Sequence, residues 1–97
     1  MMYGLTVEEF LQLQPSSQNI LINLTGLPLE ELTPDFLIKD IPVTATPNFT
    51  NWDQEKNYFF ISKHGRSSQV LAQHFAKKGL NTQFLIGGLY SLQNHLV

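Results

Sequence analysis

The chain has 97 residues, of which 42% are hydrophobic, and its six basic and eight acidic residues give a net charge of −2. This length predicts a single domain over residues 1–97, and the acidic balance, without a basic run interleaved with aromatic residues, argues against nucleic-acid binding. The absence of cysteine excludes disulfides, thiolate metal sites and cysteine nucleophiles, and no apolar run approaches the roughly 20 residues that span a bilayer.

The charges are unevenly distributed along the chain. All eight acidic residues lie between Glu8 and Glu55, whereas five of the six basic residues lie from Lys56 onward. Folding either mixes these charges or leaves one face with a positive potential that attracts small anions. Because no basic segment followed by an apolar one stands at the N-terminus, we expect no signal peptide and a cytoplasmic protein. The oligomeric state stays open.

The first elements follow from a helix start signal and a compact apolar run. Thr6 and Glu9 have the spacing of a capping box, which predicts a helix over residues 7–13 that ends before Pro15. The apolar run 19–24 is too short for a helix and predicts a buried strand. Because this run is continuously apolar and does not alternate, it favours a parallel sheet that is covered on both faces.

The middle of the chain is less regular. The triplet 33–35 has a proline in its centre and predicts the start of a helical turn that reaches about Leu37. Residues 41–46 predict a short strand near a sheet edge, because a proline stands close to its start. Residues 50–56 are expected to form a polar loop or another helical turn. We expect Trp52 in this segment to cover the core.

The second half alternates strand and helix patterns, which implies right-handed crossovers and a mostly parallel sheet. The predicted elements are a central strand over 58–61, a helix from 67 or 68 to 78, a strand over 82–86 and a helix over 89–96. Gly79 is placed to end the first of these helices. The predicted inner face of that helix consists of Val70, Leu71, His74 and Phe75. The predicted core joins Ile22, Phe60, Ile61, Leu71, Phe75 and Leu85.

A tight loop joins the predicted central strand to the helix that follows. A strand that ends in such a loop at a helix N-terminus presents several backbone N–H groups to one point, which makes a cradle for an anion. Arg66 adds a guanidinium group suited to sulfate, phosphate or carboxylate. We therefore predict an anion-binding site formed by Ser62, Lys63, His64, Gly65, Arg66, Ser67 and Ser68.

From residue 59 to residue 92 the chain resembles the second half of a single-domain rhodanese-like protein. The active-site loop of that family has the pattern Cys-x-x-Gly-x-x-Ser, and Ser62, Gly65 and Ser68 match its spacing with serine at the cysteine position. The segment Leu85-Ile86-Gly87-Gly88 is similar to the Leu-x-Gly-Gly motif of the family. The resemblance implies an α/β, rhodanese-like fold with a small, mostly parallel sheet and helices on both faces.

Several positions that serve function in the family hold other residues here. Asn23 and Thr25 stand where the family has an aspartate and an arginine. Asp40 stands where it has a histidine, and Ser67 where it has an arginine or an aspartate. Sulfur transfer of the rhodanese type needs a thiolate that carries a persulfide, and the hydroxyl of Ser62 cannot replace it. The resemblance therefore implies a degenerate member that lacks the catalytic cysteine.

Three functional hypotheses follow. The first is a non-catalytic module that binds a small anion or a partner protein through residues 62–68, without a cofactor. The second is an enzyme, either a sulfurtransferase if Ser62 replaces a native cysteine or a serine hydrolase with His64 as the base. The third is a structural or regulatory relic without a ligand. We expect no metal, because the spacing of the three histidines matches no zinc motif.

Overall fold

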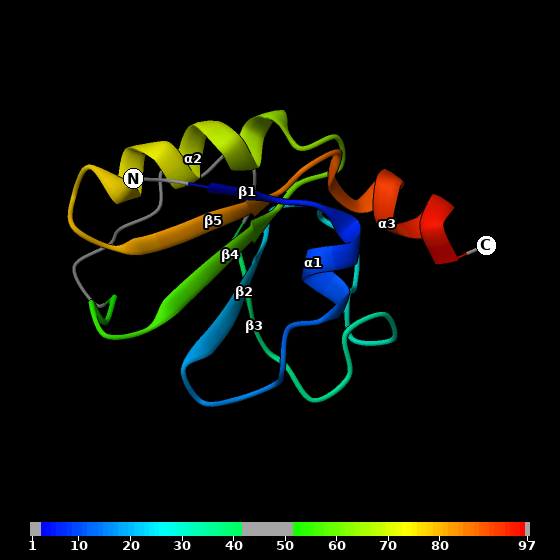
Figure 1. Ribbon diagram of the computed structural model, residues 1–97, viewed down its shortest axis with the longest axis horizontal. Coiled ribbons are helices and arrows are strands. Elements are labelled where there is room, and N and C mark those ends of the chain that lie inside the picture. The colour runs from blue at the N-terminus through cyan, green and yellow to red at the C-terminus, as the bar shows by residue number, and fades with distance from the viewer. Residues whose placement is uncertain (1–2, 42–51, 97) are drawn as a thin grey trace.

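The structure is a computed structural model that describes residues 3–41 and 52–96 (Figure 1). Its centre is a five-stranded sheet with the strand order β1-β5-β4-β2-β3, in which all neighbouring strands are parallel. The strands are β1 (Tyr3–Leu5), β2 (Asn19–Asn23), β3 (Leu37–Asp40), β4 (Asn57–Ile61) and β5 (Asn81–Leu85). The helices are α1 (Val7–Leu11), α2 (Arg66–Ala76) and α3 (Gly88–Leu96). The predicted α/β class is confirmed, and β4 is the predicted central strand.

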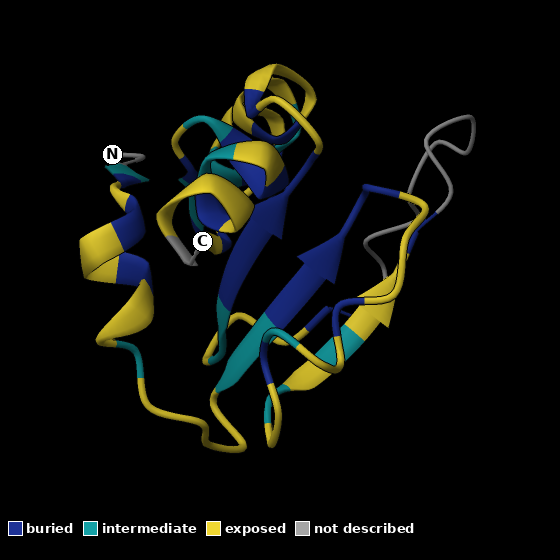
Figure 2. Cartoon of the chain, turned by 90° about the vertical axis from the view of Figure 1, so that its right-hand side faces the viewer, coloured by how far each residue is buried: buried dark blue, intermediate teal, exposed yellow. Residues whose placement is uncertain are grey.

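Successive side chains of the strands point to two separate cores, one on each face of the sheet. In β4, Phe59 and Ile61 pack with residues of α1 and α3, whereas Tyr58 and Phe60 pack with residues of α2. Helices therefore cover both faces, as predicted. Figure 2 shows that burial is concentrated in the central strands and that the helices expose their outer sides.

The predicted single core is wrong, although all six of its residues are buried or half-buried. The α2 face holds Ile22, Phe60, Leu71 and Phe75, and the opposite face holds Ile61 and Leu85. A sheet that is covered on both sides must divide its apolar side chains between two cores. The sequence pattern showed that these positions are apolar but not on which side of the sheet each one lies.

Helix α2 also presents a different face to the sheet from the predicted one. Its buried residues are Ser68, Ala72 and Phe75, whereas Val70 is 60% exposed and His74 is exposed. Small side chains at positions 68 and 72 allow close packing of the helix on the sheet. The apolar pattern alone was misleading because one buried position of this helix is a serine.

The start of helix α1 and the end of helix α2 agree with the local signals in the sequence. The capping box at α1 is confirmed: Thr6 Oγ1 accepts a hydrogen bond from the amide of Glu9 (3.1 Å), and Glu9 Oε1 accepts one from the amide of Thr6 (3.0 Å). Helix α1 ends at Leu11, two residues before the predicted end. Gly79 takes the left-handed conformation (φ 95°) beyond the last turn of α2, as a helix-ending glycine does.

One prediction for the middle of the chain is wrong, and a second falls almost wholly outside the described residues. Asp35 has a left-handed φ of 73°, so the predicted helical turn cannot continue past it, and β3 begins at Leu37. Of the predicted strand 41–46, only Ile41 is described, and it follows the end of β3 at Asp40; residues 42–46 lie outside the described residues. An edge strand does lie in this region, since β3 is the last strand of the sheet. Strand β1 was not predicted, because three residues carry too little pattern.

Trp52 is part of the core on the α2 face. Its ring stacks on Phe75 (centroids 4.8 Å apart) and packs at an angle on Tyr58 (4.8 Å) and Phe60 (5.9 Å). The ammonium group of Lys39 lies 4.8 Å from the centroid of the Trp52 ring. These contacts bury the tryptophan to 8% exposure, so the expectation that Trp52 covers the core agrees with its place in the structure.

Candidate functional site

The predicted loop lies at the carboxyl edge of the sheet, beside the end of β2. Because the strands are parallel, the segments that follow β2, β4 and β5 all emerge at this edge, where ligands of open α/β sheets bind. A hollow of about 310 Å³ opens there, lined by Leu24, Thr25, Ser62, Lys63, His64, Arg66 and Ser67. The structure thus brings five of the seven predicted site residues to one hollow, while Gly65 and Ser68 are buried beside it.

The hydroxyl group of Ser62 occupies the centre of the predicted cradle. Its Oγ accepts hydrogen bonds from the amides of Gly65 (3.0 Å) and Ser68 (3.3 Å). It donates its proton to Ser68 Oγ (3.0 Å), and the Ser68 hydroxyl donates in turn to the carbonyl of Gly65 (2.9 Å). Two of the N–H groups that were predicted to hold an anion are therefore engaged by the side chain of Ser62.

Glycines allow the loop to approach the start of α3 closely. Gly65 and Gly88 have left-handed φ angles of 97° and 68°. A Cβ on Gly88 would lie 2.6 Å from the amide nitrogen of Gly65 and would also collide with the carbonyl of Ser62. Gly87 also has a left-handed φ, of 78°, so both glycines of the Leu85-Ile86-Gly87-Gly88 segment take conformations that other residues rarely adopt. The first amides of α3 hold the loop: that of Leu89 donates to the Ser62 carbonyl (2.8 Å).

The rim of the hollow is cationic and exposed. Lys63, His64, Arg66 and Ser67 are all exposed. The His64 ring meets the Tyr90 ring edge-on, with the centroids 4.6 Å apart. Within residues 3–41 and 52–96, no carboxylate forms an ion pair with Lys63 or Arg66. These two cations are therefore available to a ligand as far as the described residues are concerned.

The arrangement provides no general base for Ser62. The proton of its hydroxyl is directed to Ser68, and the chain of hydrogen bonds ends at a backbone carbonyl. His64 makes no hydrogen bond to Ser62 in the described part of the chain. A serine nucleophile needs a base within hydrogen-bond reach, so the geometry offers no support for the serine-hydrolase hypothesis.

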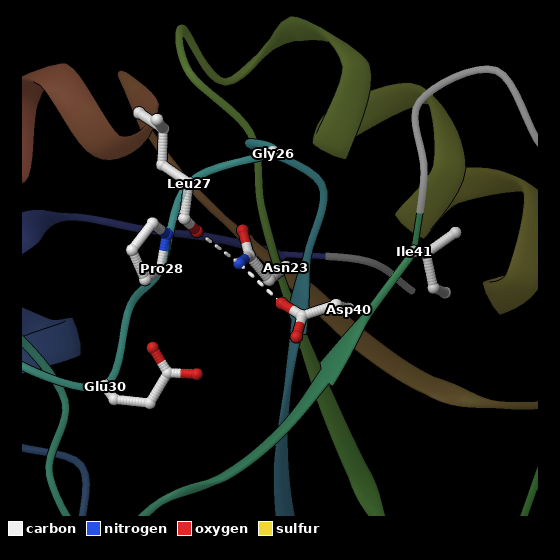
Figure 3. Close-up of a pocket in the computed structure, with 7 residues that line it drawn as sticks. All are labelled: Asn23, Gly26, Leu27, Pro28, Glu30, Asp40 and Ile41. Carbon is white, nitrogen blue, oxygen red and sulfur yellow. Dashed lines mark hydrogen bonds between the residues drawn. The ribbon is translucent and has the colours of Figure 1, made fainter.

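Three of the residues that depart from the family pattern, Asn23, Thr25 and Asp40, form one hydrogen-bond network. Figure 3 shows the part of it that joins Asn23 to Asp40 and Leu27. Asn23 Nδ2 donates to Asp40 Oδ1 (2.7 Å) and to the carbonyl of Leu27 (2.7 Å). The amide (3.0 Å) and the hydroxyl (2.7 Å) of Thr25 both donate to Asn23 Oδ1. The network lies beside a second hollow of about 470 Å³, lined by Asn23, Gly26, Leu27, Pro28, Glu30, Asp40 and Ile41.

The sequence pattern showed Asn23, Thr25 and Asp40 only as three separate departures from the family, and it did not predict that they bond to one another. Asn23 and Asp40 are partners in the register of β2 and β3. Because the sequence prediction placed the edge strand after Asp40, it could not pair the two residues. The residues that depart from the family pattern therefore stabilise one another, because the side-chain amide of Asn23 donates a hydrogen bond to the carboxylate of Asp40.

The described residues offer neither a cluster of metal ligands nor a membrane-spanning helix. No group of three or more histidine, aspartate or glutamate side chains within residues 3–41 and 52–96 is placed to hold a metal ion. Among the helices described, none has the length and apolar character that crossing a membrane requires.

No protein-family model and no curated protein matches this chain. Three crystal structures resemble it over nearly its whole length. They are the protein SSP1007 from Staphylococcus saprophyticus (TM-score 0.69, 21% identity, 92% of this chain and 91% of that chain), a rhodanese-related protein from Thermoplasma volcanium (0.72, 17%, 95% and 91%), and a rhodanese-like domain protein from Staphylococcus aureus (0.64, 18%, 92% and 89%). Together with the parallel sheet and its strand-loop-helix at residues 57–76, these likenesses show that the chain has the rhodanese-like fold.

Proposed function

We propose that this chain is a non-catalytic rhodanese-like module that binds a small anion at the loop 62–68. The observation that carries the proposal is the pairing of a hollow with two exposed cations on its rim, Lys63 and Arg66. Neither cation forms an ion pair with a carboxylate of the described residues. An oxyanion with two or more acceptor atoms suits the planar fork of a guanidinium group.

The rigidity of the loop supports binding. The hydroxyl of Ser62 fixes the amides of Gly65 and Ser68, and the start of α3 fixes the carbonyls of Ser62 and Lys63. A site whose backbone is held before the ligand arrives loses little conformational entropy on binding. The rim residues therefore stand on a fixed support, and only the side chains of Lys63 and Arg66 have to become ordered.

The chemistry of the loop supports a binding role without turnover. The chain has no cysteine. Ser62, which stands at the family's cysteine position, donates its hydroxyl proton to Ser68. The sulfurtransferase hypothesis applies only to a protein in which a cysteine stands at position 62. An acidic side chain of a partner protein offers the same oxyanion chemistry as a free ion, so the predicted protein partner would use the same two cations.

The proposal is tested by titrating the isotope-labelled protein with inorganic phosphate and with sulfate while amide signals are followed by NMR. We expect the amides of Lys63, His64, Arg66 and Ser67 to shift first. The affinity should fall as salt is added, because exposed charges are screened over about 8–10 Å. Shifts that are scattered over the surface would contradict the proposal and favour the relic hypothesis.

A matched pair of variants isolates the role of Arg66. Arg66→Ala should weaken phosphate binding about tenfold, the loss expected for a charged hydrogen-bond donor. Lys77→Ala removes the same charge from an exposed position beyond the last turn of α2 and should leave the affinity nearly unchanged. Thermal unfolding should be similar for both variants. If Lys77→Ala weakened phosphate binding as much as Arg66→Ala, the net charge of the protein and not the position of Arg66 would determine the affinity.

A further inference from the structure

We infer that the ligand of the 310 Å³ hollow is an organic anion, with its charged group at the rim and an apolar body on the floor. This inference rests on the proposed function and specifies the ligand class. It follows from a contrast within the hollow, because the residues that line its floor and those that line its rim offer different chemistry.

The floor is formed by three buried residues, Leu24, Thr25 and Ser62, which are 3%, 2% and 4% exposed. A hydroxyl group has one proton to donate. The proton of Thr25 is donated to Asn23 Oδ1 (2.7 Å), and that of Ser62 to Ser68 Oγ (3.0 Å). The backbone amide of Thr25 also donates to Asn23 Oδ1 (3.0 Å). The side chains of the floor therefore have no proton left for an oxyanion, since that of Leu24 has no donor.

The rim has the opposite character. Lys63 and Arg66 are exposed cations, and Ser67 beside them is exposed as well. A charged group that entered the floor would lose its hydration without gaining a side-chain donor, which is costly. The same group at the rim keeps part of its water and gains the two cations. The anionic group of a ligand is therefore held at the rim.

The size of the hollow indicates what fills the remainder. Its volume of about 310 Å³ is roughly ten times the 30 Å³ that one water molecule occupies in the liquid. A bare phosphate at the rim would leave the floor to water that finds no side-chain donor there. An apolar body would displace this water and have its own surface removed from solvent, which is favourable in proportion to the buried area.

The test compares anions that share a charged group and differ in their body. We expect phenyl phosphate to bind about tenfold or more tightly than inorganic phosphate, and phenylacetate to exceed acetate in the same way. Benzyl alcohol, which has the ring without the charge, should bind much more weakly than phenyl phosphate. Nuclear Overhauser contacts should connect the phenyl protons of phenyl phosphate to the methyl groups of Leu24, while Arg66→Ala should weaken binding of all four anions.

The outcomes separate this inference from the proposed function. If phosphate and phenyl phosphate bind equally, or if the phenyl contacts avoid Leu24, the inference is wrong, while anion binding at the loop stands. If benzyl alcohol binds as tightly as phenyl phosphate, charge is irrelevant and both are wrong. If none of the four anions binds, the proposed function fails, and this inference fails with it.

Discussion

The hydroxyl of Ser62 donates a hydrogen bond to the hydroxyl of Ser68, six residues further along the chain, at 3.0 Å. This bond joins the end of the central strand to the first turn of α2. Because the Ser62 oxygen also accepts from two backbone amides, its lone pairs and its proton are all engaged. The side chain at the position of the family's nucleophile is therefore part of the structure of the loop.

The wild-type chain should form no thiocyanate from thiosulfate and cyanide above background, because it has no thiolate to carry sulfur. Ser62→Cys should add little activity by itself. The reason is that the aspartate and the arginine of the family are also missing: Asn23 and Thr25 stand at their positions, carry no charge and are hydrogen-bonded to each other. Colorimetric thiocyanate assays of both proteins check this, with the heat-denatured variant as control. Protein-dependent turnover by the wild type that survives repurification, or a rate in the variant close to that of active rhodaneses, would refute the prediction.

Phe75→Ala should lower the free energy of unfolding by about 3–5 kcal/mol. Phe75 is 1% exposed and contacts the rings of Trp52 and Phe60, so its removal leaves a cavity that rigid neighbours cannot fill. The control is Val70→Ala. Val70 lies on the same helix but is 60% exposed, so its replacement should change the free energy of unfolding by less than about 0.5 kcal/mol. Urea unfolding followed by Trp52 fluorescence measures both. A loss below about 1 kcal/mol for Phe75→Ala would mean that the helix packs on another face.

Gly88→Ala should be far more destabilising than Gly26→Ala, although both glycines have similar φ angles of 68° and 74°. A Cβ at Gly26 meets no atom within 4 Å, so only conformational strain of about 1–2 kcal/mol is expected. A Cβ at Gly88 would also collide with the backbone of Ser62 and Gly65. We expect a loss of about 3 kcal/mol or more, or failure to fold. Similar melting temperatures for the two variants would disprove the close approach of α3 to the loop.

Asn23→Asp should destabilise the protein in a pH-dependent way. The change replaces the donor to Asp40 Oδ1, 2.7 Å away, with a second carboxylate. The neighbouring charge should raise the pKa of the introduced group above its unfolded value of about 3.9. A raised pKa in the folded state means that the penalty is full at neutral pH, decreases as the pH falls through the raised pKa, and is lost below about 4.

The control for this prediction is the double variant Asn23→Asp with Asp40→Asn, which restores a donor and an acceptor across the strand pair. It should recover part of the lost stability at pH 7, and its stability should depend less on pH. The comparison is made by urea unfolding at several pH values. A penalty for the single variant that does not change between pH 7 and about pH 4 would show that charge repulsion is not its cause.

The sequence predicted those parts of the fold that depend on neighbouring residues. Thr6 and Glu9 form their capping box within one helical turn, and Gly79 supplies a left-handed conformation that other residues avoid. The continuous apolar run that became β2 indicated a parallel sheet, because a strand with two covered faces needs apolar residues on both. The spacing of Ser62, Gly65 and Ser68 likewise located the loop.

Tertiary structure alone decided how these parts meet. The bond between Asn23 and Asp40 joins residues 17 positions apart and depends on the register of the edge strand β3, which the local sequence did not predict. The protons of Thr25 and Ser62 are donated to partners that only folding brings close, so the sequence did not show that the buried hydroxyl groups of the hollow have no proton left for a ligand. Residue type and spacing fix what a side chain can do over a few positions. Which partner it finds depends on the packing of distant segments, which the chain acquires only when it folds.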